Sequence, residues 1–593
     1  MVRSAKFRFS RLFKRRKAQV ETLGESAEKG IERHFFARLS HIIGIRRFMF
    51  SWILLLLLLA GGVVIQTRGL SRFYQSLQPG VGGIFTEGIV GSFSNANPIY
   101  ATSAVDASVA RLVFSGLMKY DNQNRLVPDL AEKLDANPEG NQYTVRLREN
   151  ILWHDGTPLT AADVVFTYQT IQKPDARSPL LPNWRKVEIS AKDSRTIIFT
   201  LPHGLASFPH SLTNGIVPKH VLENIPVSDL RAAQFNTVNP IGSGPFKWEG
   251  VQVSGGDPES REEQIGMTVN NNYYKDSPKI ERFVIRAFRS EQRLAEAFDK
   301  GEVSAAAGLE TAPERLEKSN TAREYSIPLT GQVMIFLKNS DEILRDEKVR
   351  SALTQATNQD ELIQALDYPV LYSRGPLLNG HVGYDKDLVQ QKYNFEAAMQ
   401  QLDNAGWKVG VDGIRSKKNQ QLTVELFTQA DTQYSQLAQT IKAQWQKIGV
   451  LVTVTEEQDT KLQSTIAAHS YDALLYGITV GPDPDVYAYW HSSQADPRSA
   501  SRLNLAEYKS KTADAALEAG RSRVASSLRK TKYQPFLKAW RKDAPAIALY
   551  QPRFLYVTNN RIFGFEPTTL NSSTDRYANV ENWAVRQDRV NIY

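Results

Sequence analysis

The chain has 593 residues, of which 41% are hydrophobic and 23% are charged, a globular composition in a chain too long for one hydrophobic core. It has no cysteine, which excludes disulfides, thiolate metal sites, a cysteine nucleophile and a lipid anchor on an N-terminal cysteine. The net charge of +9 comes entirely from residues 1–47, with 13 bases and four acids, because the remainder has 59 of each. This neutral remainder argues against nucleic-acid binding.

The first predicted segment is the basic tail, residues 1–47. Aromatic residues such as Phe7, Phe9 and Phe13 alternate with basic ones, and the basic run Lys14–Lys17 follows. This pattern predicts contact with the anionic inner leaflet of a membrane. Contact with RNA or DNA, and a disordered tail that only sets membrane topology, are the alternatives.

The second predicted segment is a transmembrane helix, Phe48–Ile65, which has 18 residues and no charge. At about 1.5 Å per residue it nearly spans a hydrocarbon core of ~30 Å. The basic excess lies on its N-terminal side, so we expect residues 1–47 in the cytoplasm and the C-terminal body outside.

A cleaved signal peptide is the alternative to this anchor, since Ala60-Gly61-Gly62 resembles a cleavage site. The segment is longer than the usual apolar region of about 7–15 residues, and it starts late, so an uncleaved anchor is favoured. Residues 66–80 are predicted to form a short linker.

The body alternates strand and helix patterns. Strands are predicted at Tyr143–Arg148, Thr196–Leu201, Leu422–Phe427 and Val450–Val454. Helical spacing links three sets: Val349, Leu353 and Ala356; Leu362, Ile363 and Leu366; and Leu437, Ile441, Trp445 and Ile448. Gly449 is expected to end the last of these helices. This alternation predicts α/β lobes.

The sequence carries no positive sign of catalysis. The nine histidines are scattered without metal-ligand spacing, and there is no nucleophile-elbow pattern. Gly242-Ser243-Gly244 precedes Pro245, so we interpret it as a turn and not as a nucleotide loop. Asp483 and Asp485 are more typical of turn formers than of an acid/base pair. We therefore expect a protein that is not an enzyme, with no metal and no cofactor.

One segment carries a family resemblance. Leu147–Phe166 resembles a signature of the extracellular solute-binding proteins of family 5, the peptide- and nickel-binding receptors of ABC importers. Further matches follow the family order: Phe93–Pro98, Asn239–Phe246, Lys348–Leu353, Ala405–Trp407, Tyr471–Gly477 with Asp483–Asp485, and Ala544–Tyr550. The resemblance covers about residues 85–593. Within the signature we expect Trp153, His154 and Asp155 to be structural, and Thr160 with Asp163 to cap a helix.

The resemblance implies an α/β fold like that of type II periplasmic binding proteins, behind the one N-terminal transmembrane helix. We expect two large lobes joined by a hinge, with the chain crossing between them near residues 320 and 540, and a smaller extra lobe. The implied divisions are lobe I at 81–118, 236–322 and 541–593, extra lobe II at 119–235, and lobe III at 323–540.

The implied function is that of an extracytoplasmic receptor at the cell membrane. The resemblance implies a ligand, expected to be an oligopeptide, that is captured by cleft closure and passed to ABC permease and ATPase subunits. A ligand sensor on the same fold and a surface hydrolase are the alternatives. The 47-residue tail is too short for a catalytic signalling domain, which counts against the sensor.

The resemblance also implies binding residues. In peptide-binding relatives an aspartate just before the Asp-Pro loop anchors the peptide's ammonium group, and Val480 stands in that place here. Valine cannot pair with a cation, so either Asp483 or Asp485 substitutes, the loop is shifted, or the ammonium group is not recognised. The other expected lining residues are Asn97, in place of the family's usual aspartate, and Tyr476, Thr479, Tyr487, Trp490 and Asn504. For the aromatic ones, packing in the lobe core is the alternative.

The expected topology gives a direct prediction. A reporter that works only outside the cytoplasm, fused after residue 80, should be active because the body follows an N-in helix. The matched reporter that works only in the cytoplasm should be inactive at the same junction. The opposite pair of activities would contradict the anchor orientation.

Overall fold

The computed structural model describes residues 46–257, 261–366, 368, 370–496, 498–499 and 502–591. The predicted cytoplasmic tail therefore lies outside the described residues, except for its last two positions. The chain divides into two compact units, residues 1–78 with 587–593, and residues 79–586.

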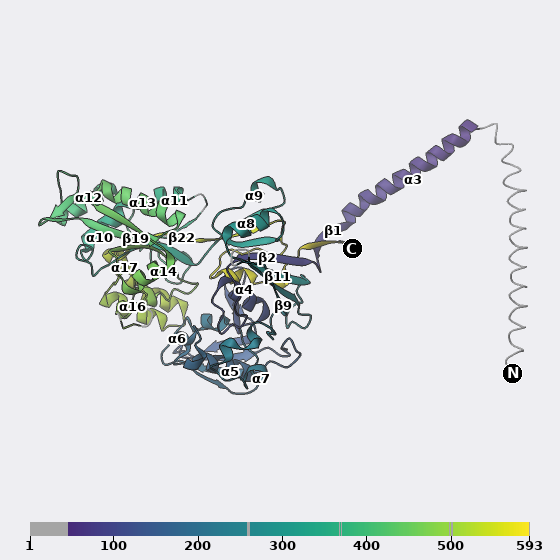
Figure 1. Cartoon of the computed structure of the whole chain (residues 1–593), viewed down its shortest axis with the longest axis horizontal. Helices are drawn as coiled ribbons and strands as arrows, with labels where there is room; N and C mark the ends of the chain where they lie inside the picture. The colour runs from purple at the N-terminus through teal and green to yellow at the C-terminus, as the bar shows by residue number, and fades with distance from the viewer. Residues whose placement is uncertain are drawn as a thin grey trace, which may run out of the picture. The chain divides into compact units, whose positions relative to one another are not determined.

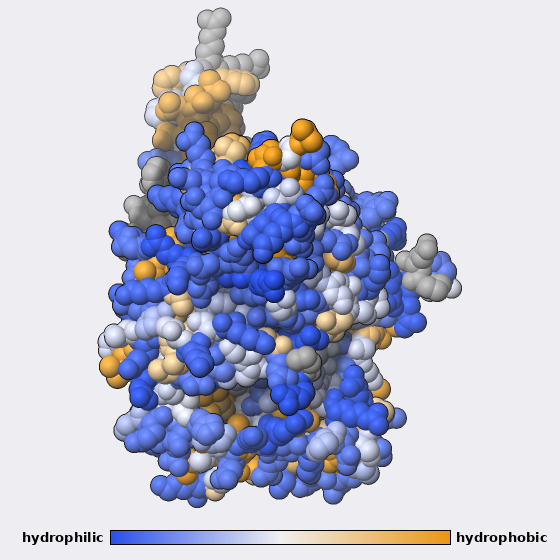
Figure 2. All heavy atoms as spheres, turned by 90° about the vertical axis from the view of Figure 1, so that its left-hand side faces the viewer, coloured by the Kyte–Doolittle hydropathy of each residue, from blue (hydrophilic) through white to orange (hydrophobic). Residues whose placement is uncertain are grey.

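The first unit contains helix α3 (Arg46–Tyr74), strand β1 (Gln75–Gly80) and strand β24 (Arg586–Asn591). Within α3, Phe48–Arg68 has a mean hydropathy of 2.6 and is long and apolar enough to cross a membrane. Figure 2 shows hydrophobic side chains gathered on this helix. The segment predicted as a linker is instead helix up to Tyr74 and then β1, which pairs with β24. Residues 66–78 contain no proline to break the backbone hydrogen bonds.

The second unit begins with a seven-stranded mixed sheet. In order across the sheet its strands are β13 (Arg323–Pro328), β23 (Arg553–Thr558), β12 (Ala305–Leu309), β2 (Ile84–Val90), β11 (Arg282–Phe288), β10 (Glu262–Val269) and β9 (Phe246–Ser254). The central strand β2 is parallel to β11 and β12, and the other pairs are antiparallel. Helices α4 (Ala104–Val113) and α8 (Glu291–Asp299) contact β2. The short helix α9 (Arg315–Lys318) follows β12.

A four-stranded antiparallel sheet lies in the part of the chain inserted between β2 and β9. Its order is β5 (Ala131–Ala136), β6 (Gln142–Leu147), β8 (Thr196–Thr200) and β7 (Glu188–Ala191). The hairpin β3 (Met118–Tyr120) and β4 (Leu126–Pro128) precedes it; the helical segments are α5 (Ala161–Gln172), η3 (Pro174–Ala176), α6 (Leu181–Trp184), η4 (Phe208–Thr213), α7 (Lys219–Leu222), η5 (Leu230–Ala232) and η6 (Gln234–Asn236). Buried residues of this sheet and of the seven-stranded sheet belong to one continuous hydrophobic core.

A six-stranded sheet forms the rest of the second unit. Its order is β15 (Leu371–Tyr372), β22 (Ala546–Gln551), β14 (Gly331–Leu337), β21 (Ala473–Thr479), β19 (Thr423–Gln429) and β20 (Leu451–Glu457). Every residue of β14 is buried, as expected for a central strand covered on both faces. Val333, Ile335 and Leu337 face one core, while Met334 and Phe336 face another.

Helices cover both faces of this sheet (Figure 1). On one face lie α10 (Glu347–Ala356), α11 (Gln359–Gln364), α12 (Phe395–Asn404) and α13 (Thr432–Lys447), and on the other α14 (Asp459–Ala468), α15 (Tyr487–Trp490), α16 (Lys511–Arg521) and α17 (Ser526–Asp543). The remaining elements are the small sheet β16 (Lys408–Val409), β17 (Arg415–Lys417) and β18 (Gln420–Gln421), and the turns η7 (Ser492–Ala495), η8 (Ser573–Tyr577) and η9 (Val580–Asn582).

The predicted strands and helices of the body are confirmed, as β6, β8, β19 and β20 and as α10, α11 and α13. Gly449 follows α13 with a φ of 87°, a left-handed conformation that favours glycine. The predicted cap is also present, since Asp163 and Thr160 form a capping box at the start of α5.

The chain passes between the seven- and six-stranded sheets at two short connections. The first lies at Leu329–Thr330, between β13 and β14, and the second is Pro552, between β22 and β23. The two connections touch, because the Leu329 amide donates to the Pro552 carbonyl at 2.8 Å. The strands thus change sheet several residues after the lobe boundaries expected at 322 and 540, because β13 still pairs with β23 and β22 with β14. The division into lobes itself stays a prediction.

A buried ion pair fixes the C-terminal segment to the central strand of the seven-stranded sheet. Glu87 on β2 accepts hydrogen bonds from Arg576 Nε and Nη2, both at 3.0 Å, and from the Tyr577 hydroxyl. The two charged side chains are 0% and 1% exposed. Burial alone would lower the pKa of Arg576, but the Glu87 charge raises it above its ordinary value, so the guanidinium stays charged.

Removing one partner of this pair should be costly. Arg576→Met leaves the Glu87 carboxylate buried without its counter-charge, and we expect a loss of about 3–5 kcal/mol in the free energy of unfolding. Urea unfolding of the full chain in detergent, followed by tryptophan fluorescence, measures this loss. Glu314→Gln is the matched control, because its pair with Lys318 is 76% and 71% exposed, and it should not change the midpoint. Equal midpoints for both variants would contradict the assigned role.

Candidate functional site

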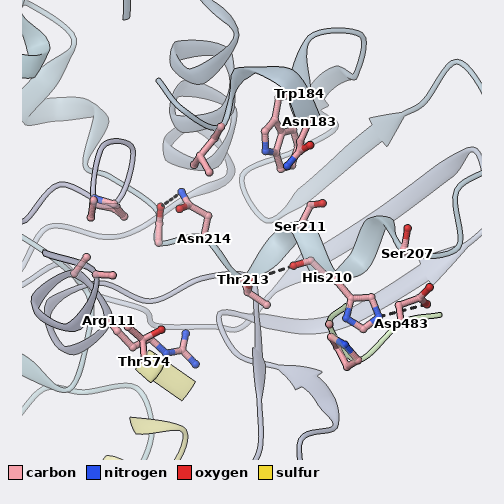
Figure 3. Close-up of a pocket in the computed structure, with 18 of the residues that line it drawn as sticks. Arg111, Asn183, Trp184, Ser207, His210, Ser211, Thr213, Asn214, Asp483 and Thr574 are labelled. Carbon is pink, nitrogen blue, oxygen red and sulfur yellow. Dashed lines mark hydrogen bonds and ion pairs between the residues drawn. The ribbon is translucent and has the colours of Figure 1, made fainter. Parts of the chain in front are cut away.

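A cavity of about 520 Å³ opens within the second unit. Its lining residues come from segments next to the seven-, four- and six-stranded sheets. Helix α4 contributes Ala107, Ala110 and Arg111, the segment around η4 contributes Ser207 and His210, and the loop after β21 contributes Val480–Asp483 and Asp485. Figure 3 shows Arg111 and Thr574 at one side of the cavity, and His210 with Asp483 at another. The site is therefore assembled from positions far apart in the sequence.

Hydrogen bonds from its backbone amides help to hold the loop 480–485 in place. The amides of Val480 and Gly481 both donate to the Thr330 carbonyl, each at 2.9 Å, so the loop is tied to the first connection between the sheets. The Asp485 amide donates to Asp483 Oδ1 at 2.9 Å, which is the turn expected of an Asp-Pro-Asp sequence.

A half-buried histidine also holds this loop. His381 lies with Nε2 2.9 Å from the Gly481 carbonyl, and its Nδ1 accepts the Leu378 amide at 3.3 Å. Burial lowers the pKa of His381 from 6.5 to about 4, although the Gly481 carbonyl and Asp483 oppose this. The neutral ring therefore carries its proton on Nε2 and donates it to Gly481.

Asp483 is neutralised by an arginine. Arg529 of α17 donates to both of its oxygens, at 2.7 and 2.6 Å, in a bidentate pair whose side chains are 6% and 11% exposed. Burial acts to lower the pKa of Arg529, but Asp483 raises it above its ordinary value. His210 lies 3.7 Å from Asp483, yet burial lowers the pKa of its ring, so Asp483 has its counter-charge in Arg529.

Asp485 is also paired, and it bridges the cleft. Its Oδ2 accepts hydrogen bonds from Arg521 Nη2 and from the Ser207 hydroxyl, both at 3.0 Å. Ser207 belongs to the segment inserted between β2 and β9, so this bond joins the two walls. Arg521 lies 4.2 Å above the Tyr487 ring, a cation–π contact that fixes its position.

Arg111 is the exception among the charged residues of this cavity. It makes no hydrogen bond or ion pair with any residue that the structure describes. Its positive charge nevertheless acts on Asp575: burial raises the pKa of Asp575 and Arg111 opposes this. The guanidinium is thus free to bind a group that enters the cavity.

A second cavity of about 910 Å³ adjoins the first and shares Asn183, Ser207, Ser211 and Asp485 with it. Its wall combines apolar residues such as Leu201 and Phe208 with Arg185, Lys186, His203, Tyr487 and Glu518. Both volumes are of the size usual for ligand sites, about 300–1,000 Å³.

The structure brings only some of the expected binding residues to these cavities. Val480, Asp483 and Asp485 line the first cavity, and Asp485 and Tyr487 line the second. Tyr476 instead accepts from Gln463 Nε2 at 3.1 Å, and the Thr479 carbonyl accepts the Tyr489 hydroxyl at 2.6 Å. Neither Tyr476 nor Thr479 lines either of the two cavities. Ligand contact by any of the expected binding residues stays a prediction.

Three expected binding residues are buried in the protein. Asn97 is 1% exposed and donates to Asn236 Oδ1 at 3.1 Å. Asn504 is fully buried and donates to the carbonyls of His491 and Tyr508 at 3.1 and 2.8 Å. Trp490 is fully buried between Phe336 and Trp540. The sequence could not separate these roles, because buried amides and aromatics have the same residue types as pocket linings.

The sequence reasoning missed several pocket residues. For Arg529 a signal existed: it shares a helix face with the buried Tyr533, Phe536 and Trp540, and a base at such a position needs a buried partner. For Arg111 and Ser207 no local pattern points to the cavity.

The family signature has a structural role. Trp153 is 1% exposed, and His154 accepts the Gly242 amide at 3.2 Å while its Nε2 lies 3.0 Å from the Gly244 carbonyl. Gly242 packs so closely against helix α4 that an added Cβ would lie 1.8 Å from the Val113 carbonyl oxygen. The glycines thus permit close backbone packing, and the chain bends at Gly244 and Pro245 without forming a hydrogen-bonded turn.

The pH dependence of stability tests the His381 contact. Because its pKa is about 4 in the folded state and 6.5 ordinarily, the unfolded state binds the proton first as the pH falls. This contribution is complete above pH 6.5 and is lost between about 6.5 and 4, up to about 3 kcal/mol. His381→Gln keeps a donor for Gly481 but cannot titrate, so its urea midpoint should fall less over this range. Parallel pH profiles for the two proteins would exclude the neutral ring.

Residues 125–556 match the family model described as bacterial extracellular solute-binding proteins, family 5. The oligopeptide-binding protein AppA of Bacillus subtilis is 26% identical over 516 residues, covering 85% of this chain and 92% of that protein. The probable D,D-dipeptide-binding periplasmic protein DdpA of Escherichia coli is 23% identical, covering 74% and 81%.

Two solved structures are similar to this chain as well. NikZ from Campylobacter jejuni, in complex with Ni(L-His), is 26% identical with a TM-score of 0.70, covering 84% of this chain and 99% of that one. AppA in complex with a nonapeptide is 25% identical with a TM-score of 0.67, covering 86% and 100%. The family and these relatives are binding proteins and not enzymes. The chain belongs to the bacterial extracellular solute-binding proteins of family 5, and its fold is that of a periplasmic binding protein.

Proposed function

We propose that this chain is a membrane-tethered receptor that captures an oligopeptide outside the cytoplasm and delivers it to an ABC importer. The observation that carries the proposal is the pair of adjoining cavities, which lie where the inserted segment faces the loop 480–485. The name of AppA and its nonapeptide complex supply the peptide class. The permease and ATPase subunits of such an importer are the expected partners.

Capture by cleft closure is supported by the way the sheets are joined. The two connections, at Leu329–Thr330 and Pro552, are short and hydrogen-bonded to each other. Such element ends can absorb a change of backbone angle and act as a hinge. Because Val480 and Gly481 both donate to Thr330, a ligand that presses on this loop acts directly on one connection. The Ser207–Asp485 bond then joins the two walls when they meet.

Helix α3 supports the tether. Its window Phe48–Arg68 has the length and hydropathy of a membrane span, and the chain has no cysteine for a lipid anchor. The basic residues before it favour a cytoplasmic N-terminus and an extracytoplasmic body. A tether of this kind holds the receptor at the membrane that contains its importer.

Binding without chemistry is supported by the pairing of the acids in the site. A general acid or base must reach the reacting group and have a pKa near the working pH. Asp483 and Asp485 are each held by an arginine, which occupies both oxygens of Asp483 and Oδ2 of Asp485. We therefore propose that the ligand leaves the site unmodified.

The same pairing bears on recognition of the peptide's N-terminus. Val480 lines the cavity at the place where peptide-binding relatives have an aspartate, and the nearby carboxylates of Asp483 and Asp485 already have counter-charges. Asp485 Oδ1 has no hydrogen bond with a described residue, but it is buried and therefore not open to an ammonium group. We propose that the N-terminus of the ligand is bound without a charge pair.

Acetylation of the peptide tests this proposal. We expect an N-acetylated nonapeptide to bind the full chain, held in lipid nanodiscs, within about threefold of the free peptide, because a free ammonium group gains no charged hydrogen bond here. Val480→Asp should create that bond, so acetylation should then cost about tenfold in Kd by isothermal titration calorimetry.

Val411→Asp is the matched control, since it makes the same substitution at a fully exposed valine outside the cavities. It should leave the acetylation penalty small. Failure of both peptide forms to bind the unaltered protein would overturn the peptide receptor. A large penalty in the unaltered protein would show that another carboxylate anchors the N-terminus.

A further inference from the structure

We propose that the two adjoining cavities select an oligopeptide with at least two negative charges, one from its C-terminal carboxylate and one from an acidic side chain. This inference rests on the proposed function and names its ligand class more closely. It follows from which charges of the cleft already have partners and which do not.

Every carboxylate on the two walls has a partner. Asp483 accepts both arms of Arg529, and Asp485 accepts Arg521 and Ser207. Glu518, on the wall of the second cavity, lies 3.2 Å from His491 Nε2 and is 63% exposed to water. Asp485 Oδ1 has no hydrogen bond among the described residues but is buried, so a positively charged ligand group would have to displace one of these contacts to bind Asp483 or Asp485. Displacing the buried Arg529 would leave that cation without its partner.

Three cations on the walls of the two cavities have no side-chain partner in the described part of the chain. Arg111 in the first cavity, and Arg185 and Lys186 in the second, make no side-chain hydrogen bond or ion pair with any residue among those described. Arg185 and Lys186 follow one another between α6 and β7, at the rim of the second cavity. Each of the two cavities therefore has positive charge on its wall that is not paired with any residue the structure describes.

This arrangement suits two separate anionic groups. The cavities share Asn183, Ser207, Ser211 and Asp485, so one extended ligand can occupy both. A carboxylate near Arg111 gains a charge-assisted hydrogen bond with a guanidinium that is otherwise unused. A second carboxylate reaches Arg185 and Lys186, while apolar residues such as Leu201 and Phe208 accommodate the chain between them.

Two simpler explanations account for part of this pattern. Arg111 lies in the last turn of α4, where a cation is favourable next to the helix dipole, and Arg185 and Lys186 are exposed residues of the kind found on any surface. Neither explanation accounts for the arginine pairs of both loop aspartates in the same cleft.

Four N-acetylated nonapeptides of otherwise identical sequence separate these possibilities. They carry either Glu or Gln at one internal position and either a free or an amidated C-terminus. With the full chain in phosphatidylcholine nanodiscs, we expect the Glu peptide with a free C-terminus to bind at least about tenfold tighter than the doubly neutral peptide. High salt should reduce this difference, because the contacts are between charges.

Substitutions assign the two groups to the two cavities. Arg111→Gln should abolish the preference for one carboxylate, and the double variant Arg185→Gln, Lys186→Gln should abolish the preference for the other. Arg111→Lys should keep part of the effect. Lys538→Gln, at an exposed position of α17 outside both cavities, is the matched control and should change none of the four affinities.

The outcomes are distinct. Equal affinity for all four peptides overturns the charge selection and leaves the peptide receptor intact. A preference that survives both the Arg111 and the Arg185–Lys186 substitutions overturns the assignment to these side chains. Failure to bind any of the four peptides, and the free nonapeptide as well, overturns the proposed function itself. Because Arg185 and Lys186 are exposed, their variants should fold even if Arg111→Gln does not.

Discussion

The buried ion pair of Glu87 and Arg576 holds together the elements that form one wall of the site. Glu87 lies on β2, the central strand of the seven-stranded sheet, and Arg576 lies on η8, almost at the other end of the chain. The pair is completed by Ser108, which accepts from Arg576 at 3.1 Å and belongs to α4. One guanidinium thus joins the first strand, the first helix and the C-terminal segment of this unit. These are the elements that bring Arg111 and Thr574 to the same cavity wall.

The opposite wall depends on a second buried guanidinium. Arg529 holds Asp483 with both arms, while Thr330 accepts two amides of the same loop and His381 donates to the Gly481 carbonyl. A loop of alternating proline and aspartate has few backbone donors of its own, so side chains from α17 and elsewhere must fix it. The consequence is chemical as well as mechanical. The two aspartates that shape the loop are already paired with arginines, so they attract a cationic ligand only weakly.

Much of the fold was readable from the sequence, because strong periodicity survives tertiary context. The strands at Tyr143–Arg148 and Leu422–Phe427 and the helix around Trp445 were predicted from spacing alone and are confirmed. The segment 66–80, predicted as a linker, continues α3 to Tyr74 and then forms β1, since glycine and polar residues there do not stop a helix that proline leaves unbroken. Of the site, Val480, Asp483, Asp485 and Tyr487 were found through the family resemblance. Arg111 and Ser207 were not, because nothing local marks a residue whose place in a cavity depends on segments hundreds of positions away.

The distribution of net charge along the chain explains why the sequence did not indicate the charge of the ligand. The whole excess of +9 lies in residues 1–47, and the remainder of the chain is neutral. A neutral total still permits a strong local potential, because a concave wall with low-dielectric sides concentrates the field of its unpaired charges. The relevant quantity is therefore the pairing of each charge within the cleft and not the sum over the surface. Asp483 and Asp485 count as two negative charges in the sequence, yet with Arg529 and Arg521 beside them they contribute little to the field that an arriving ligand meets. What remains is the positive charge of Arg111, Arg185 and Lys186, and this favours a ligand whose own charges are negative.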